Sequence, residues 1–402
     1  MKLHRHLAQS VVSALPEIFD PEKGRFADRV IEYHLKNNKK WGARDRRFFA
    51  ESIYDIVRWW RLLWGAVGQE PSLEPAKLWP VLGGWLVMKN LEIPDWAEFA
   101  GFDRGKAKAF LSRADHPRAV AQSIPDWLDE LGERELGDRW NSILPALNVQ
   151  ADVVLRANRL KTTPKDLRLA LEAEGVSARL RDGFDDAVQL TERKNVFRTE
   201  IFKKGHFEVQ ELASQKVAPF LEVKPGDRVI DACAGAGGKT LHMAALMGNK
   251  GRIVAMDVEE RKLKELRDRC SRAGADIVET RVIESSKTIK RLDGACDRLL
   301  LDVPCSGLGV LRRNPDAKWK LKPSDLDRIG TLQREILGSY HRMVKPGGTM
   351  VYATCSLLPS ENERQVAWFL EKNPGWTLEA EENYRPDEGF DGFYMARLRL
   401  KA

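Results

Sequence analysis

The last part of the chain alternates apolar strand-like runs with amphipathic helices, and this alternation constrains the fold more than any other feature. The runs are RVIDACA, RIVAMD, DRLLLDVP and GTMVYATC, and a helical pattern follows each of them. In EERKLKELRDRC, for example, Leu263, Leu266 and Cys270 share one face while charges cover the other. Strands that are apolar on both faces, each followed by a helix, indicate a parallel sheet covered on both sides. We therefore predict a doubly wound α/β fold for this region.

The rest of the chain falls into two regions with different patterns. Residues 1–148 place apolar side chains such as Ile53 and Ile56 at helical spacing and lack the alternation typical of strands. Residues 149–215 contain a strand-like DVVLRANRL, a helix-like TPKDLRLALEAEG and a second strand-like DAVQLT. We predict an all-helical domain over 1–148, a small α/β domain over 149–215 and the doubly wound domain over 216–402.

Composition and charge limit the classes of function. The chain is 43% hydrophobic and 31% charged, which is typical of a soluble globular protein. Its apolar runs are far shorter than the ~18 residues of a membrane span, and MKLHRHLAQSVVSALPEIFD is not typical of a secretory signal. Five cysteines without a CxxC pair argue against a disulfide framework or a zinc site. We expect a cytoplasmic monomer without a metal, and the net charge of +7 suggests a polyanionic partner.

One turn of the helical region, NKKWGARDRR, gathers five basic residues against a single acid. The basic residues are Lys39, Lys40, Arg44, Arg46 and Arg47. Clustered Lys and Arg side chains release counterions when they bind a nucleic-acid backbone. The turn is therefore a candidate phosphate contact, with a solvated helix junction as the alternative.

A glycine-rich segment, DACAGAGGKT, follows the first strand of the doubly wound region. Glycine lets a backbone approach a ligand, and the N–H groups at a helix start face that ligand. A P-loop needs GxxxxGK[ST], but Cys233 stands where its first glycine belongs; a GxGxxG fingerprint from Gly235 fails at Thr240. Asp257, which ends RIVAMD, suits the ribose of S-adenosylmethionine or of a dinucleotide. The segment alone leaves a methyl donor and a nucleotide open.

Two cysteines end the next two strands of the pattern. Asp302 and Cys305 follow one run, and Cys355 follows the other. Carbon 5 of cytosine becomes nucleophilic when a thiolate adds to carbon 6, and a thiolate both adds and leaves readily. A second group then helps to remove the carbon 5 proton, and a group such as Asp302 eases the addition by contacting ring nitrogen 3. The pair suits a carbon-methylating enzyme that acts on cytosine, without deciding which cysteine attacks, whereas we expect Cys270 and Cys296 to pack in the core.

At these residues the chain resembles the Sun-type (RsmB-like) family of RNA cytosine-5 methyltransferases. DACAGAGGKT, DVPCSGLGVLRRNPDAKW and TCSLLPSENE match the family's motifs in order and spacing, and GHFEVQELASQ and GFDGFYMARL are similar to further family segments. The resemblance implies a Rossmann-like class I methyltransferase domain, a small RRM-like subdomain that guides the substrate, and a NusB-like RNA-binding domain at the N-terminus.

The resemblance also implies roles for individual residues. Cys355 is expected to attack the base, Cys305 to assist its release, and Lys239 to lie near the target base. The residues expected around S-adenosylmethionine are Cys233, Ala234, Gly235, Ala236, Gly237, Gly238, Lys239, Asp257, Glu284 and Asp302. The small subdomain is expected to contribute Arg156, Asn158 and Lys161 to RNA binding.

We therefore predict an S-adenosylmethionine-dependent RNA (cytosine-5) methyltransferase, with ribosomal RNA as the first candidate substrate and transfer RNA as the second. Two alternatives come from other classes, a P-loop nucleotide hydrolase and a non-catalytic RNA-binding factor of ribosome assembly. The presence of Asp302, Cys305 and Cys355 together argues against a vestigial site.

Overall fold

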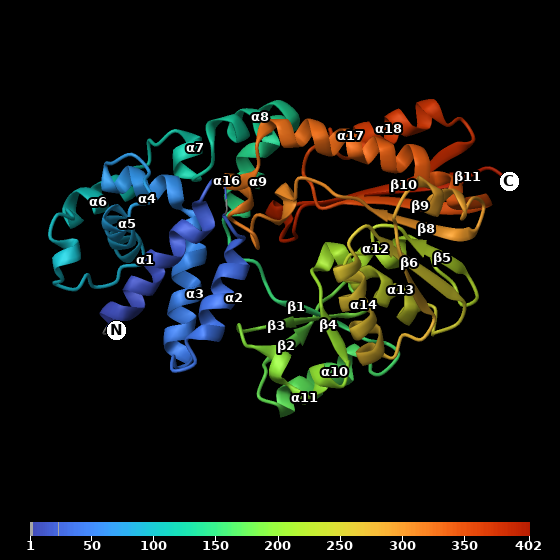
Figure 1. Ribbon diagram of the computed structural model, residues 1–402, viewed down its shortest axis with the longest axis horizontal. Coiled ribbons are helices and arrows are strands. Elements are labelled where there is room, and N and C mark those ends of the chain that lie inside the picture. Colours follow the sequence, from blue (N-terminus) through green and yellow to red (C-terminus); the bar gives the residue numbers. More distant parts are fainter. Residues whose placement is uncertain (1–2, 23) are drawn as a thin grey trace. The chain divides into compact units, whose positions relative to one another are not determined.

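The computed structural model describes residues 3–22 and 24–402, and the chain forms two compact units (Figure 1). The first unit comprises residues 1–149 and 310–323, and the second comprises residues 150–309 and 324–402. The segment 310–323 therefore belongs to the first unit, although the sequence pattern assigned it to the methyltransferase domain. Within the part of the chain that the structure describes, no helix has the length and apolar character needed to cross a membrane.

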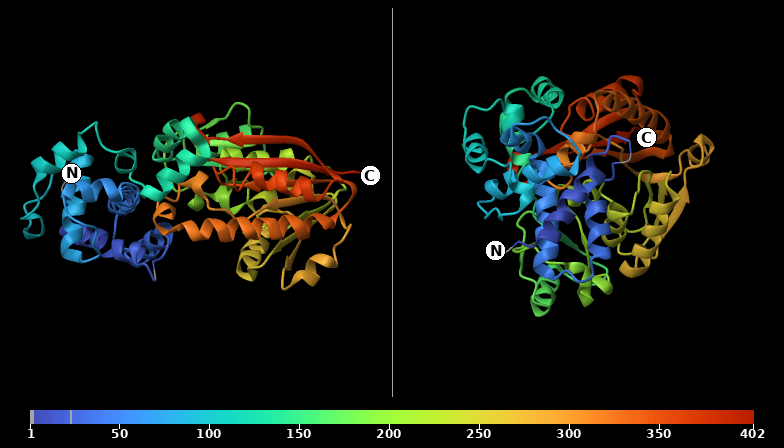
Figure 2. Two further views of the ribbon diagram at one scale, coloured as in Figure 1. Left: turned by 90° about the horizontal axis from the view of Figure 1, so that it is seen from above. Right: turned by 60° about the vertical axis from the view of Figure 1, so that its left-hand side comes forward.

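The first unit is helical, as its spacing of apolar residues predicts; in Figure 2 its helices α1 to α9 run from blue to green, and α16 is orange. Its helices are α1 (Arg5–Phe19), α2 (Ala27–Asn37), α3 (Ala43–Arg58), α4 (Trp60–Val67), α5 (Pro75–Met88), α6 (Arg104–Leu111), α7 (Arg118–Ala121), α8 (Asp126–Leu136), α9 (Trp140–Leu147) and α16 (Ala317–Lys320), with 3-10 turns at Ala97–Phe99 and Gly137–Arg139. The apolar faces of α1, α3 and α5 pack into one core in which Trp64, Trp79 and Trp85 are buried.

The segment 310–323 is fixed to this unit by polar contacts that lie under its surface. The indole N–H of Trp319 donates to the carbonyl of Val57 (2.7 Å), and the ammonium of Lys318 donates to the carbonyl of Arg58 (2.8 Å). Burial lowers the pKa of Lys318 well below its usual value. The segment 310–323 thus packs as part of the helical unit.

The second unit begins with a small antiparallel sheet. Its strands are β1 (Val154–Ala157), β2 (Ala178–Leu180), β3 (Ala187–Leu190) and β4 (Phe207–Val209), in the order β2-β3-β1-β4. Helix α10 (Pro164–Ala173) covers it, and Thr163 caps α10 by accepting a hydrogen bond from the N–H of Asp166. A 3-10 turn at Val196–Arg198 and helix α11 (Glu200–Lys203) lead into β4.

The main sheet of this unit has seven strands in the order β10-β11-β9-β8-β5-β6-β7. The strands are β5 (Arg228–Asp231), β6 (Arg252–Asp257), β7 (Val278–Val282), β8 (Cys296–Asp302), β9 (Val344–Thr354), β10 (Trp376–Tyr384) and β11 (Phe393–Leu400). The five strands from β7 to β9 are parallel, and β11 and β10 add an antiparallel edge. The predicted doubly wound sheet is confirmed, whereas the antiparallel hairpin was not predicted from the sequence.

Helices cover both faces of the main sheet, with α12, α13 and α14 on one side and α17 and α18 on the other (Figure 1). They are α12 (Leu212–Phe220), α13 (Gly238–Leu246), α14 (Glu260–Ala273), α15 (Ser286–Lys290), α17 (Pro323–Tyr340) and α18 (Glu363–Lys372), with 3-10 turns at Leu308–Val310, His341–Met343 and Pro386–Glu388. Neighbouring residues of β8 pack on opposite faces, Leu299 and Leu301 toward α17 and Leu300 toward α13. Apolar side chains on both faces explain why these strands lack alternation.

Candidate active site

The two cysteines of the candidate site meet because the strands that carry them are neighbours. Strands β8 and β9 are parallel, with Asp302 opposite Ala353 in the register. Cys305 and Cys355 follow these strand ends, and their Sγ atoms lie 3.2 Å apart. Both are free thiols and both are half-buried. We call Cys305 and Cys355 the cysteine pair.

The surroundings of Cys305 determine the protonation state of its thiol. The hydrogen bond with Cys355, burial and the negative charge of Glu361 all raise the pKa of Cys305 well above its usual value. Cys305 therefore stays protonated at neutral pH, and a protonated thiol can donate its hydrogen to the sulfur of Cys355.

A buried carboxylate, Glu361, joins the two loops that carry the cysteine pair. It accepts a hydrogen bond from the backbone N–H of Ser306 (2.8 Å) and another from the hydroxyl of Ser356 (2.9 Å). Gln333 of α17 donates to the same carboxylate (3.2 Å) and to the carbonyl of Pro304 (3.0 Å). Glu361 is only 2% exposed. Each cysteine thus has a neighbour in the chain that is bound to the same acid.

Glu361 was not predicted from the sequence as a site residue. It lies within SENE, where an acid close to a helix start is usually a solvated residue or a helix cap. In the structure its neighbour Asn362 also turns inward: it accepts from Thr354 (2.5 Å) and donates to the carbonyl of Ser356 (3.1 Å). Two consecutive polar residues that bind the segment five to eight positions before them hold the turn at Cys355.

Lys239 and Asp302 form an ion pair beside the cysteine pair. The Nζ atom of Lys239, in the first turn of α13, lies 2.5 Å from Oδ2 of Asp302 at the end of β8. Burial alone would lower the pKa of Lys239, but the attraction of Asp302 outweighs it and negative charge on Cys355 adds to it, so the pKa is raised. The ammonium also lies 5.2 Å from the centre of the Phe393 ring. Lys239 is therefore a fixed cation.

The glycine loop, residues 233–239, runs from β5 to α13. Gly237 has φ of +86°, and a Cβ there would lie 2.3 Å from the side chain of Leu266, so only glycine fits. The carboxylate of Asp257 accepts from the backbone N–H of Gly235 and from that of Glu259, both at 2.9 Å. Asp257 thereby joins the glycine loop to the end of β6.

This loop fits the donor that the sequence predicts. A Cβ added at Gly235 or at Gly238 would meet no atom within 4 Å, so the backbone is open on that side. Each oxygen of Asp257 keeps a lone pair for a ribose hydroxyl. The neighbouring Val258 is 66% exposed and offers an apolar surface. Glycine loop, acid and apolar side chain together suit S-adenosylmethionine.

Cys233 and Glu284, which are also predicted to contact the methyl donor, differ in their exposure. The thiol of Cys233 is half-buried in the glycine loop, and burial raises its pKa well above its usual value. Glu284 is exposed just after β7, next to Ile283, whose N–H donates to the carbonyl of Asp257 (2.9 Å). Contact of Glu284 with the methyl donor stays a prediction.

The prediction that Arg156 and Asn158 contact RNA is corrected by their burial. Arg156 is 2% and Asn158 5% exposed. The amide of Asn158 donates to the carbonyls of Gly205 and Ala273, both at 2.8 Å. Lys161, though exposed in part, donates to the carbonyls of Lys204 (2.8 Å) and Arg272 (2.7 Å). Asn158 and Lys161 thus bind the small α/β region to the end of α14. Polar and basic residues of this kind are easily mistaken for a nucleic-acid surface when only the sequence is read.

The basic turn, residues 38–47, covers the connection from α2 to α3 and the first five residues of α3. Its Lys39, Lys40, Arg44 and Arg47 are exposed. Arg46 instead is half-buried and donates to the carbonyl of Leu35 (2.8 Å), so it holds the turn together. The turn therefore offers four exposed cations, and their contact with RNA stays a prediction.

The fold and site define a class of protein before any relative is considered, an S-adenosylmethionine-dependent methyltransferase. The crystal structure of PH0851 superposes on this chain with a TM-score of 0.82 at 27% identity, and the match covers 99% of both chains. A methyltransferase homolog protein from Pyrococcus horikoshii gives a TM-score of 0.62 at 29% identity, covering 70% of this chain and 97% of that one. NSun6 from Pyrococcus horikoshii with SFG shares the fold, with a TM-score of 0.64 at 21% identity over 69% of this chain and 98% of that one.

Sequence relatives give the family. The model for 16S rRNA methyltransferase RsmB/F matches residues 218–399, and that for the RsmF/B-like ferredoxin-like domain matches residues 124–197. Ribosomal RNA small subunit methyltransferase B of Enterobacter sp. (strain 638) is 33% identical over 315 residues, 74% of this chain and 71% of that protein. Probable ribosomal RNA small subunit methyltransferase B of Bacillus subtilis (strain 168) is 34% identical, over 70% of this chain and 68% of that protein. The chain belongs to the RsmB/F family of methyltransferases.

Proposed function

We propose that this protein transfers the methyl group of S-adenosylmethionine to carbon 5 of a cytosine in small-subunit ribosomal RNA. The observation that carries the proposal is the cysteine pair, two free thiols 3.2 Å apart at the ends of adjacent strands, beside the glycine loop. Attack on a pyrimidine ring and its reversal need a thiolate and a second group close by. The names of the relatives above supply the ribosomal substrate. Free thiols also fit the reducing cytoplasm, where we place the reaction.

We assign the attack to Cys355 and the assistance of release to Cys305. The raised pKa of Cys305 keeps it protonated and able to donate to Cys355. The ammonium of Lys239, paired with Asp302 (2.5 Å), places a fixed cation beside the cysteine pair. A protonated thiol is a poor nucleophile, so we give the attack to the other cysteine of the pair, Cys355.

The proposed reaction has two stages. The Cys355 sulfur bonds to carbon 6 and the ring electrons move toward carbon 5, which takes the methyl group that S-adenosylmethionine supplies. The carbon 5 proton then passes to water, and the electrons of that carbon–hydrogen bond restore the ring double bond while the bond between carbon 6 and sulfur breaks. Cys355 departs as a thiolate that accepts a hydrogen bond from the Cys305 thiol. Asp302 accepts from the Lys239 ammonium at 2.5 Å and relays a proton from it to ring nitrogen 3 as the sulfur adds, and the proton returns when the sulfur leaves.

The other predicted parts keep their places in this proposal. The glycine loop, Asp257, Asp302 and Glu284 surround the donor. Residues 1–148 form a NusB-like domain that binds RNA through the four exposed cations of the basic turn, 149–215 guide the substrate, and 216–402 carry the reaction, apart from the segment 310–323 that packs with the helices.

The test is methylation of purified RNA in vitro. Small-subunit ribosomal RNA and transfer RNA are incubated separately with the protein, with and without S-adenosylmethionine, and both are sequenced after bisulfite treatment. We expect one or more cytosines of the ribosomal RNA to resist bisulfite only when donor and protein are both present. Bisulfite resistance confined to transfer RNA would contradict ribosomal RNA as the substrate and indicate transfer RNA. Transfer of the methyl group to RNA without any bisulfite-resistant cytosine would refute methylation at carbon 5. Binding of RNA without methyl transfer would support the alternative of a non-catalytic assembly factor.

A further inference from the structure

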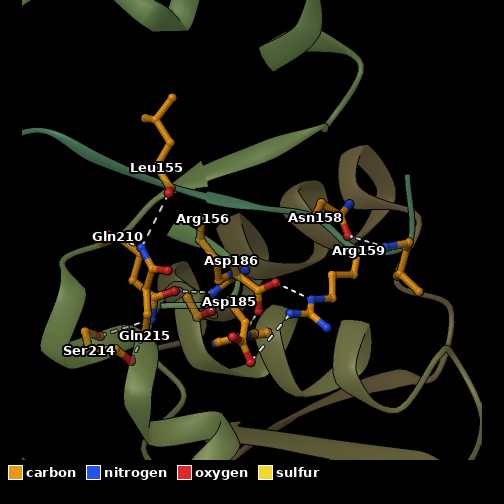
Figure 3. A network of polar contacts seen from close by, with 12 residues as sticks. Leu155, Arg156, Asn158, Arg159, Asp185, Asp186, Gln210, Ser214 and Gln215 are labelled. Carbon is orange, nitrogen blue, oxygen red and sulfur yellow. Dashed lines mark hydrogen bonds and ion pairs between the residues drawn. The ribbon is translucent and has the colours of Figure 1, made fainter. Parts of the chain in front are cut away.

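Arg156 is a buried cation of the small sheet that points toward the glycine loop. Its Nη1 atom lies 2.5 Å from the carbonyl oxygen of Gly238, the first residue of α13, and it also donates to the side chain of Gln210. Figure 3 shows Arg156 reaching from β1 into a network with Gln210. Burial lowers the pKa of Arg156 to about 10, so the guanidinium stays charged at neutral pH.

A second guanidinium holds the same loop two residues earlier. Arg269, on α14, donates through Nη1 to the carbonyl of Ala236 (2.6 Å). Its Nη2 donates to the carboxylate of Glu208 (2.9 Å), and Arg272 donates to the other oxygen of that carboxylate. Two carbonyls of the glycine loop are thus each bound by an arginine.

Glu208 is the anion that offsets the cost of burying these cations. It is 4% exposed and lies directly opposite Arg156 in the antiparallel pairing of β1 with β4. A cation near a helix N-terminus opposes the helix dipole, and buried charges need a partner. Because Glu208 faces Arg156 and binds Arg269, it compensates both cations from the small sheet.

We propose that Arg156 and Arg269, held by Glu208, are positioning residues that fix the glycine loop for donor binding. In a trans peptide the carbonyl of one residue points opposite to the N–H of the next, so binding the Gly238 carbonyl directs the N–H of Lys239 away from Arg156. The small sheet is therefore part of the support of the donor site. This inference rests on the proposed role of the glycine loop in binding S-adenosylmethionine.

The experiment measures binding of S-adenosylhomocysteine, the stable reaction product, to the full chain by calorimetry. Arg156→Met and Arg269→Met keep most of the side-chain volume and leave Glu208 with at least one arginine. Arg193→Met is the matched control, because Arg193 also donates to a backbone carbonyl, that of Ala151 (2.6 Å), away from the loop. We expect roughly a tenfold or greater rise in Kd for the first two variants, as for loss of a charged hydrogen bond, and an unchanged Kd for the control.

The outcomes separate positioning from plain stability. Arg156→Lys keeps the charge and should recover part of the affinity, and kinetics should show a raised KM for S-adenosylmethionine with a smaller change in kcat. A lower Tm with wild-type Kd in Arg156→Met and Arg269→Met would overturn the inference. If Arg156→Met does not fold, Arg156→Lys and Arg269→Met decide by the same measurement. A wild-type protein that does not bind S-adenosylhomocysteine would instead contradict the proposed function.

Discussion

The glycine loop and the cysteine pair are held in place by opposite kinds of charge. Cations, Arg156 and Arg269, bind backbone carbonyls of the glycine loop. An anion, Glu361, accepts hydrogen bonds from both loops of the cysteine pair. The difference follows from what each region presents. In the glycine loop the bound carbonyl of Gly238 directs the next N–H, that of Lys239, away from Arg156, whereas the cysteine loops must hold two sulfur atoms at a set distance.

The two supports also differ in their distance along the chain. Arg156 and Glu208 lie on β1 and β4 of the small sheet, far in sequence from the loop that they support. Glu361 lies six residues after Cys355. Damage to one support should therefore affect donor binding, and damage to the other should affect the chemical step. The predictions that follow test this separation, starting with the residue that touches both regions.

Lys239 belongs to both regions, because it lies in the glycine loop and its cation pairs with Asp302 beside the cysteine pair. Lys239→Met should lower kcat by roughly 100- to 1,000-fold, the usual cost of losing a fixed charge in an active site. Lys203→Met is a suitable control, since Lys203 pairs with Glu200 on the exposed face of α11 (2.6 Å). A kcat within about threefold of wild type would mean that Lys239 serves the fold alone.

Asp231 tests the glycine-loop side through stability. Burial raises its pKa to about 7, although Thr240 donates to its carboxylate (2.7 Å). The folded state thus holds a proton that the unfolded state loses near pH 4, and the stability that this proton supplies is present below pH 4 and lost as pH rises through 7. We expect the free energy of unfolding, relative to Asp231→Asn, to fall by about 2–3 kcal/mol at most between pH 5 and 8. Urea unfolding at the two pH values measures it, and an equal difference at both would contradict the assignment.

Glu361→Gln tests the cysteine side. The glutamine amide cannot accept at both positions, so one donor, the N–H of Ser306 or the hydroxyl of Ser356, is left without its partner. We expect the single-turnover rate to fall about tenfold to thirtyfold while the Kd for S-adenosylhomocysteine stays the same. Glu363→Gln is the control, because Glu363 binds Asn383 (2.7 Å) on the far side of the turn. If Glu361→Gln changed the Kd for S-adenosylhomocysteine and left the single-turnover rate unchanged, Glu361 would support donor binding, which would contradict the proposed separation of the two supports.

The basic turn should affect neither region. The triple variant Lys39→Gln, Lys40→Gln, Arg44→Gln should weaken RNA binding a few-fold and reduce the slope of log affinity against log salt by up to about 2–3, since each phosphate that is no longer neutralised lowers the slope by about one unit or slightly less. Arg46 is left intact because it holds the turn. Neutralising the exposed Arg104, Lys106 and Lys108 of α6 is the control. An identical drop in affinity in both variants would show a general effect of charge and no specific binding by the turn.

The parts of the site that the sequence predicts are those that local pattern determines. Apolar runs place Asp302, Cys305 and Cys355 at strand ends, and glycines mark the loop between β5 and α13. Among the strands that the sequence pattern does not predict, β7 and β10 carry the polar segments VETRV and WTLEAEENY and give no apolar run. They join the sheet by pairing with a neighbour that already exists, which is a tertiary effect.

The supports of the site could not be predicted for a related reason. Arg156, Glu208 and Glu361 are charged, and charged side chains are normally assigned to the surface or to a ligand. Only the pairing of β1 with β4 shows that Arg156 faces Glu208, and only the adjacency of β8 and β9 shows that one carboxylate can reach both cysteine loops. The same limit applies to Arg156 and Asn158, because the sequence pattern does not show that they are buried.

The central claim, that Cys355 attacks the base and Cys305 assists its release, is tested most directly by trapping the covalent intermediate. RNA is incubated with each alanine variant, with and without S-adenosylmethionine, and separated on a denaturing gel. Removal of the releasing group should let the adduct accumulate, so Cys305→Ala should give a slow RNA–protein band that requires the donor and disappears on proteolysis. Cys355→Ala should be inactive and leave the RNA free. A band with Cys355→Ala alone would reverse the two roles, and full activity of both variants without any band would contradict the mechanism.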